Sequence, residues 1–139
     1  MIYLDTSILG AIFFREPGAQ KLLGHLEKHA KQGLTISAWT LTEMSSVGGI
    51  KQRTGSIDLA TRDQALAKFQ RFASKHLNMA EIEPVDFRTA AVFIETPINL
   101  RAGDALHLAV ARRLGAQIAS LDQRMLDAAD ALGLARHDF

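Results

Sequence analysis

The sequence predicts an α/β protein: a single three-layer α/β/α domain around a central parallel sheet of four to five strands. Short β-prone apolar segments alternate with longer segments in which apolar side chains recur at helical spacing. Strands that alternate with helices form a parallel sheet covered on both faces. The chain has 139 residues and no internal repeat, which fits one domain, residues 1–139, with its own core.

Two strands and four helices are expected in the N-terminal half. The first helix follows a cap at Thr6 or Ser7 and stops before Pro17. Glycine ends the second and third helices, at Gly33 and Gly55. The expected strands are 2–4 and 34–37, and the expected helices are 8–15, 18–32, 40 or 42 to 54, and the long amphipathic 58–76.

The C-terminal half is expected to add three strands and three helices. Gly115 and Gly133 mark the ends of its last two helices. The expected strands are 80–83, 116–119 and a short last one at 134–137, and the expected helices are 86–95, 101–114 and 122–132.

Composition excludes several classes of protein. The chain has no cysteine, so it holds no disulfide, thiolate metal site or thiol nucleophile. A content of 47% hydrophobic and 22% charged residues is that of a globular domain rather than a disordered chain. The longest apolar run, 8–14, is too short to span a bilayer, and no basic region precedes it as in a signal peptide. We therefore expect a cytoplasmic protein without a membrane partner.

Four acidic residues are predicted to meet at one edge of the sheet. Asp5 follows the first strand and Asp122 follows the strand 116–119. Glu43 and Asp104 lie in the first turns of helices that begin near that edge, because crossovers are right-handed. Each acid alone is explained by stabilisation of a helix N-terminus. Together they repel one another, and no lysine adjoins any of them in sequence, so a divalent cation is expected to neutralise them.

The chemistry of these ligands indicates which ion and which reaction to expect. Oxygen ligands without cysteine or paired histidine favour Mg²⁺ or Mn²⁺ over zinc. Such an ion lowers the pKa of a bound water and holds a scissile phosphate for in-line attack. The acidic cluster therefore suits the hydrolysis of phosphodiester bonds.

The acids lie in four recognisable segments. These are residues 2–7 (IYLDTS), the Thr42-Glu43 pair, residues 100–109 (LRAGDALHLA) and residues 120–125 (SLDQRM). In type and order they resemble the PIN-domain ribonucleases, most closely the VapC toxins of bacterial toxin–antitoxin pairs, over essentially the whole chain. The resemblance implies a PIN-like fold and a metal-dependent endoribonuclease, with Asp5, Glu43, Asp104 and Asp122 as its catalytic, metal-binding quartet.

The resemblance also implies supporting groups and partners. Thr6 or Ser7 matches a hydroxyl position near the metal-bound water, and Ser120 stands where the family commonly has threonine. VapC-like toxins usually form homodimers, and a small antitoxin protein holds them inactive, often with a basic residue in the acidic site. We therefore expect an RNA substrate, a cognate antitoxin and a homodimer.

Other polar residues are weighed from the sequence alone. Arg101 opens the helix that carries Asp104 and is the best candidate for contact with an RNA phosphate. His107 is expected to pack or to form hydrogen bonds rather than to bind the metal, and Asp127 is expected to lie on the surface. Four dispersed histidines are given no role in a site: His25, His29, His76 and His137.

The charge balance is compatible with this hypothesis. The formal net charge is +1, from 16 basic and 15 acidic residues. Setting aside four acids for a metal site leaves 11 against 16, so the remaining surface is basic by 5. The alternative is a catalytically silent PIN-like module that binds RNA or protein, but such a module has no reason to keep four mutually repelling carboxylates.

Overall fold

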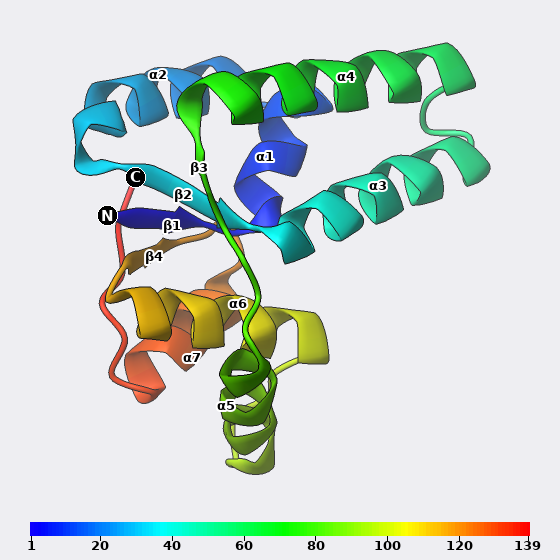
Figure 1. The fold of residues 1–139 in the computed structure, drawn as a ribbon. Helices are drawn as coiled ribbons and strands as arrows, with labels where there is room; N and C mark the ends of the chain where they lie inside the picture. The colour runs from blue at the N-terminus through cyan, green and yellow to red at the C-terminus, as the bar shows by residue number, and fades with distance from the viewer.

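Four parallel strands form one sheet with helices on both of its faces in a computed structural model of residues 1–139 (Figure 1). The predicted fold class is confirmed. The elements are β1 (Ile2–Leu4), α1 (Thr6–Phe13), α2 (Ala19–His29), the 3-10 turn η1 (Ala30–Gln32), β2 (Leu34–Ser37), α3 (Ala38–Arg53), α4 (Leu59–His76), β3 (Asn78–Ala80), α5 (Pro84–Glu95), α6 (Ala102–Leu114), β4 (Gln117–Ala119) and α7 (Gln123–Ala131).

The order of the strands places a binding edge at β1 and β4. The sheet order is β3-β2-β1-β4, and every neighbouring pair is parallel. The chain moves outward from β1 through β2 to β3 and then returns to the other side of β1 as β4. Ligands of open parallel sheets bind beyond the carboxyl ends of the strands where this direction reverses, here the ends of β1 and β4.

The two faces of the sheet bury separate apolar clusters because successive side chains of a strand point in opposite directions. Ile2 and Leu4 of β1 pack into a core shared with α1, α2, α3 and α4. Tyr3 points the other way, into a core built mainly by α5, α6 and α7. Figure 1 shows these two groups of helices on opposite sides of the sheet. No helix combines the length and the apolar character that a membrane crossing requires.

The first helix begins earlier than predicted. Asp5, rather than Thr6 or Ser7, is its N-cap: Asp5 Oδ1 accepts a hydrogen bond of 3.1 Å from the backbone N–H of Ser7. A capping aspartate leaves the chain helical from Thr6 onward. The residue that caps α1 is therefore also the first acid of the predicted site.

Helix α3 also begins earlier than predicted, at Ala38 rather than at residue 40 or 42. The strand β2 ends at Ser37, whose extended backbone leads directly into the helix. Glu43 consequently lies in the second turn of α3 and not in its first. It has no capping role there, so the prediction that a helix terminus explains Glu43 was wrong.

Two further differences concern short strands. β3 occupies Asn78–Ala80, not 80–83, because the next helix starts at Pro84, two residues ahead of its predicted start. The backbone N–H of Glu83 donates to Asp86 Oδ2 at 2.8 Å and fixes that start. The expected last strand, 134–137, is reduced to one parallel bridge between Ile118 and Arg136, so the sheet has four strands.

Candidate active site

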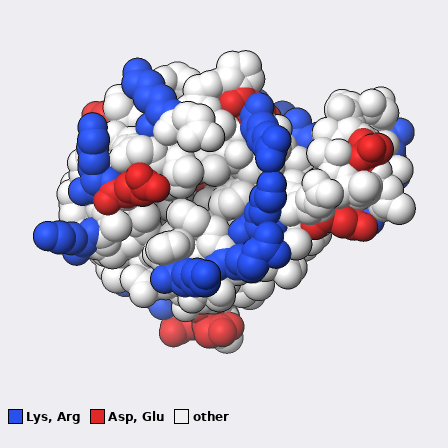
Figure 2. Space-filling view, turned by 90° about the horizontal axis from the view of Figure 1, so that it is seen from above, with Lys and Arg blue, Asp and Glu red and all other residues white.

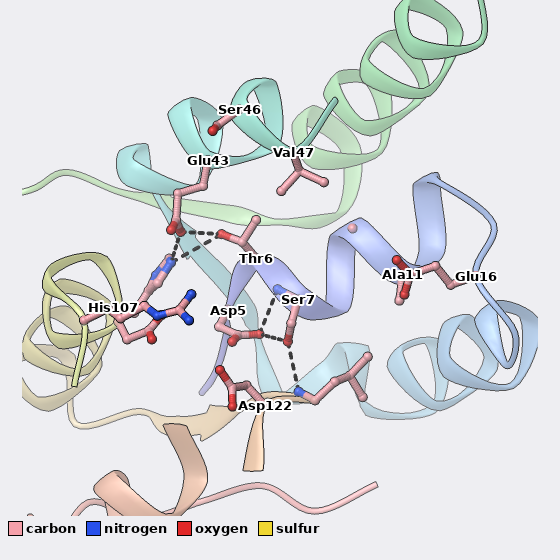
Figure 3. A pocket seen from close by; sticks show the side chains of 14 residues that line it. Asp5, Thr6, Ser7, Ala11, Glu16, Glu43, Ser46, Val47, His107 and Asp122 are labelled. Atoms are coloured by element: carbon pink, nitrogen blue, oxygen red, sulfur yellow. Dashed lines mark hydrogen bonds and ion pairs between the residues drawn. The ribbon is translucent and has the colours of Figure 1, made fainter. Parts of the chain in front are cut away.

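A cavity of about 470 Å³ opens at the carboxyl edge of β1 and β4. Its lining includes all four predicted acids together with Thr6, Ser7, Arg101 and His107. Figure 3 shows Asp5, Glu43, His107 and Asp122 facing this space from different elements. Residues up to 117 positions apart in sequence, from 5 to 122, therefore meet where strand order reverses.

Asp5 is held rigidly at the base of this cavity. Its backbone N–H donates to Ala119 O at 3.1 Å, which continues the β1–β4 ladder beyond the strand. Its carboxylate accepts hydrogen bonds from Ser7 Oγ at 2.5 Å and from Ser120 Oγ at 2.6 Å. The side chain is buried, and this burial raises the pKa of Asp5 although both hydroxyls oppose the shift.

The loop after β4 positions Asp122 through the same hydroxyl groups. Ser120 Oγ accepts the backbone N–H of Asp122 at 2.9 Å, and Ser7 Oγ accepts that of Leu121 at 2.9 Å. Asp122 in turn caps α7 through the N–H of Arg124 at 2.9 Å. Ser7 and Ser120 thus connect the ends of β1 and β4 and orient two of the acids.

Glu43 belongs to a buried hydrogen-bond network. Thr6 Oγ1 donates to Glu43 Oε1 at 2.6 Å, and His107 Nε2 donates to the same oxygen. On its other side, His107 Nδ1 bonds with the Tyr3 hydroxyl at 2.7 Å, and that hydroxyl donates to Ser37 Oγ at 2.8 Å. His107 therefore has the hydrogen-bonding role expected of it, and it orients Glu43.

The network also sets the ionisation of Glu43. Burial by itself would raise the pKa of Glu43, but the hydrogen bonds from His107 and Thr6 and the positive charge of a protonated His107 ring outweigh burial and lower it. The buried indole Nε1–H of Trp39 lies beside this carboxylate and contributes in the same direction, although it completes no hydrogen bond. Glu43 is thus held in its charged form.

Asp104 has no such support. Burial raises its pKa, and the charges of Asp122 and Glu43 raise it further, while His107 and Arg101 oppose the shift only through space. No hydrogen bond to the carboxylate contributes. Asp104 is therefore the acid whose charge most needs a partner that the chain itself does not supply.

The donor set fits a hard divalent ion. Every candidate ligand is a carboxylate oxygen, which is what Mg²⁺ and Mn²⁺ prefer. The carboxylates do not form a closed cage, since no three of them bring oxygens within 4.8 Å of one another. An open arrangement suits an ion that keeps several waters, as Mg²⁺ usually does in proteins. Asp5, Glu43, Asp104 and Asp122 could hold such an ion.

The expected surface position of Asp127 is confirmed: Asp127 accepts a hydrogen bond of 2.8 Å from Gln123 Nε2 and does not line the cavity. Two other residues of the cavity were not predicted. Glu16 and Ser46 do line it, although nothing in the periodicity marks them. Glu16 follows Arg15, which has a positive φ of 55°, and the chain turns back there toward α2. A turn of this kind leaves no clear signal in the sequence.

The sequence profile of the PIN domain matches residues 2–131. The chain belongs to the PIN-domain family. A curated relative supports this assignment: Ribonuclease VapC46 of Mycobacterium tuberculosis is 31% identical over 138 residues, which cover 96% of this chain and 94% of the relative.

Solved structures of VapBC and VapC proteins have the same fold. VapBC2 from Rickettsia felis, bound to a DNA fragment from its promoter, superposes with a TM-score of 0.75 and 17% identity, over 99% of this chain and 98% of the other. The sarcin-ricin-loop-cleaving toxin VapC20 of Mycobacterium tuberculosis gives a TM-score of 0.71 and 16% identity, with coverage of 99% and 98%. At these identities the similarity concerns the fold and the course of the chain.

Proposed function

We propose that this PIN-domain protein is a divalent-metal-dependent endoribonuclease that acts as the toxin of a VapBC-type toxin–antitoxin pair in the cytoplasm. The observation that carries the proposal is the convergence of four carboxylates on one cavity, with Asp104 left without a compensating group. The 31% identity to a ribonuclease of the VapC type over nearly the whole chain supports the same activity.

Each residue of the site would have a distinct role in the reaction. Asp5, Glu43, Asp104 and Asp122 would hold Mg²⁺ or Mn²⁺, which supplies an activated water and stabilises charge on the phosphate. Ser7 and Ser120 keep Asp5 in place, and Thr6 and His107 keep Glu43 charged and directed at the cavity. Arg101, at the cavity rim, can bind a phosphate oxygen of the RNA backbone.

Cleavage of RNA by the purified chain tests the proposal. We expect cleavage with Mg²⁺ or Mn²⁺ and none with EDTA. Asp104→Asn should lower kcat by at least about 100-fold, because it removes a charge that acts on the reacting centre. Asp127→Asn is the matched control, since it makes the same change outside the cavity, and it should cleave normally.

The silent-module alternative makes the opposite prediction. If the wild-type chain binds RNA but cleaves no substrate with either ion, the nuclease proposal is wrong. A thermal-shift titration distinguishes the two hypotheses without any substrate: Mg²⁺ should raise the Tm of the wild type and leave that of Asp104→Asn nearly unchanged.

An antitoxin is the protein partner that fits this site. The acidic cavity would accept a lysine or arginine side chain in place of the cation. Co-expression with a short neighbouring open reading frame should relieve toxicity, and Asp104→Asn should not be toxic at all. Toxicity that persists in Asp104→Asn would show a cause other than cleavage.

We also propose a homodimer. Helix α5 exposes several large apolar side chains, those of Val85, Phe87, Val92 and Ile94, and a second copy could cover them. Sedimentation analysis should give the mass of two chains, and Phe87→Glu should shift it to one. A wild-type monomer at micromolar concentration would contradict this part of the proposal.

A further inference from the structure

Three histidines that are far apart in sequence form a cluster away from the acidic cavity. His25 and His29 lie one turn apart on α2, and His137 lies in the C-terminal tail. The rings of His25 and His29 stack at a centroid distance of 4.2 Å, and that of His137 lies 5.2 Å and 4.9 Å from them. The sequence-based description of these three residues as dispersed was therefore wrong.

Hydrogen bonds orient the rings as metal ligands are usually oriented. His29 Nδ1 lies 2.9 Å from the backbone carbonyl of His25, which can only accept, so Nδ1 carries the proton. The lone pair of His29 is therefore on Nε2. Histidine ligands of metal ions commonly donate their other N–H to a backbone carbonyl in this way, which fixes the tautomer.

His25 and His137 present ring nitrogens to each other. Their Nε2 atoms are 2.9 Å apart. Burial lowers the pKa of His25, and the neighbouring His29, His137 and Lys28 lower it further. Burial and His29 likewise lower the pKa of His137, while Asp138 opposes the shift. Both lowered pKa values favour the neutral form of His25 and His137, and neutral imidazole is the form that binds metals.

We propose that His25, His29 and His137 form a binding site for a borderline transition-metal ion, Zn²⁺ foremost, that joins the C-terminal tail to α2. One ligand nitrogen from each residue lies within 4.8 Å of the others. Nitrogens bound to a single zinc ion at about 2.1 Å are at most about 4.2 Å apart, so small side-chain rotations suffice. The proton that His25 and His137 share must move to Nδ1 when the ion binds.

The chemistry separates this site from the acidic one. Three imidazoles suit zinc, cobalt, nickel or copper, whereas the carboxylate cavity suits Mg²⁺ or Mn²⁺. Three protein ligands leave one tetrahedral position for water or a ligand from outside. His25 and Phe139 line a neighbouring cavity of about 540 Å³ from which such a ligand could enter.

An ion at this site would fix the position of the C-terminal tail relative to α2. The backbone of the tail already pairs with β4, through His137 N to Ile118 O at 2.8 Å and Ile118 N to Ala135 O at 2.9 Å. A metal bond from His137 would add a direct connection to α2. The proposal therefore makes two predictions: a metal affinity that depends on the histidines, and a stabilisation of the fold by the metal.

Cobalt binding tests the site directly. The chain is purified without a histidine tag and in the Asp104→Asn background, which weakens the acidic site, and is titrated with Co²⁺ alone. We expect one equivalent to give the intense visible absorption of a four-coordinate, nitrogen-ligated ion, and Zn²⁺ to displace it. His29→Gln and His137→Gln should each weaken binding by at least about 10-fold, since even groups outside the coordination shell contribute that much.

His76→Gln is the matched control, because His76 is exposed on α4 and outside the cluster. It should bind cobalt as the parent does, and Zn²⁺ should raise its Tm but not that of His137→Gln. The proposal is overturned if no tight equivalent binds, if the spectrum is that of an octahedral oxygen site, or if His137→Gln binds normally. It stands or falls independently of nuclease activity, which is assayed with Mg²⁺.

Discussion

Asp104 is a residue whose proposed role in the site lowers the stability of the metal-free fold. Its carboxylate is partly buried near Asp122 and Glu43, without a hydrogen bond that supports its charge. The raised pKa means that the folded state holds the proton more tightly than the unfolded chain does. Above that raised pKa, the charged carboxylate therefore destabilises the metal-free protein.

We accordingly expect Asp104→Asn to be more stable than the wild type in EDTA at neutral pH. Each kcal/mol that the substitution adds to the free energy of unfolding would raise the Tm by roughly 4 °C in a domain of this size. As pH falls from the raised pKa to the ordinary aspartate range, the wild type takes up its proton and the advantage disappears. Thermal unfolding from pH 7 to pH 4 checks this, and an advantage that grows toward low pH would contradict it.

Gly103 is a second residue on which the site depends, because of a close approach rather than backbone freedom. A Cβ at this position would lie 3.1 Å from Glu43 Oε2 and 3.2 Å from Trp39 Nε1. Gly103→Ala therefore requires Glu43 or Trp39 to move by a few tenths of an ångström. We expect kcat to fall by about 10- to 100-fold, because sub-ångström misplacement of a catalytic group has effects of that size.

Gly24→Ala is the control for Gly103→Ala. Gly24 lies inside α2, and an added Cβ there meets nothing within 4 Å. The substitution should leave cleavage unchanged and stabilise the fold by about 0.5–1 kcal/mol, the usual gain from glycine to alanine in a helix. Normal activity in Gly103→Ala would contradict the inference that cleavage depends on the close packing around Glu43.

At the residue scale, the sequence predicted the four acids but not the hydrogen bonds through which other side chains orient them. Asp5 and Asp122 follow strands, and parallel topology brings strand ends to one edge, so their meeting could be predicted. The bond between His107 and Tyr3 joins positions 104 residues apart and depends on rotamers inside the core. No local pattern encodes such a contact, and the same holds for Trp39 beside Glu43.

At the scale of elements, one ion pair connects α5 to the helix that carries Asp104. Arg113 of α6 donates from Nε to Asp86 Oδ1 at 2.8 Å and from Nη2 to Asp86 Oδ2 at 2.9 Å. Arg113 Nη2 also donates to Glu81 O at 2.8 Å. Asp86 is 1% exposed, so the carboxylate depends on this partner.

Loss of this pair should destabilise the fold. Burial raises the pKa of Asp86, but the hydrogen bonds and charge of Arg113 outweigh burial and lower it. Asp86→Asn should reduce the free energy of unfolding by about 2 kcal/mol at pH 7, the contribution of charged hydrogen bonds. The stabilisation is present above the ordinary aspartate range, and the wild type loses it as pH falls through the lowered pKa.

Urea unfolding at pH 7 and pH 3 measures this difference. The exposed Asp63, which also pairs with an arginine, provides the control: Asp63→Asn should change stability by less than about 0.5 kcal/mol. A loss from Asp86→Asn that stays constant down to the lowest pH would mean that the charge of Asp86 is unimportant.

The elements that sequence reasoning misplaced are those whose boundaries depend on distant contacts. The Ser37 hydroxyl accepts from Tyr3 instead of capping α3, so the helix start could not be judged from capping residues. The alternation in 80–83 resembles a strand, but Asp86 fixes a helix start at Pro84 and shortens β3. The long amphipathic helix α4, by contrast, is determined by its own periodicity.

At the scale of the whole molecule, opposite charges are segregated. The acids that line the cavity gather at one edge of the sheet, whereas the face formed by α2 and α4 carries a band of lysine and arginine side chains with fewer acids (Figure 2). Its exposed basic residues are Lys21, Lys28, Lys31, Lys68, Arg71 and Lys75. A near-neutral sum of +1 thus conceals two regions of opposite sign.

Alternation of strands and helices was enough to predict the fold class, but not how the tail folds back. His137 reaches α2 only because residues 134–137 run beside β4. The sequence predicted a short strand there, but not which strand it would pair with or that it would bring His137 to α2. The histidine cluster is therefore a property of the assembled molecule. The segregation of charge is one as well, since Lys21 and Asp122 line adjoining cavities only in the folded chain.

The basic face gives the last prediction, which concerns how RNA reaches the acids. Lys21 and Lys28 line the second cavity, which shares Ala11, Glu16 and Leu121 with the acidic one, so a strand leaving the site can continue past them. Replacing both lysines by glutamine should raise the KM for RNA and leave kcat nearly unchanged, because these contacts bind substrate and transition state equally.

Salt dependence distinguishes this role from a general effect of charge. Each phosphate contact to a single strand contributes about 0.7 to the slope of log affinity against log salt. Loss of two such contacts in the double variant should therefore reduce the magnitude of this slope by about 1.4. Lys75→Gln, on α4 and outside both cavities, should keep the wild-type slope. The acids repel the RNA backbone wherever no cation covers them, so the RNA needs basic residues along its path to the cavity. If the double variant keeps the wild-type salt slope, the RNA strand reaches the acids over another face of the molecule.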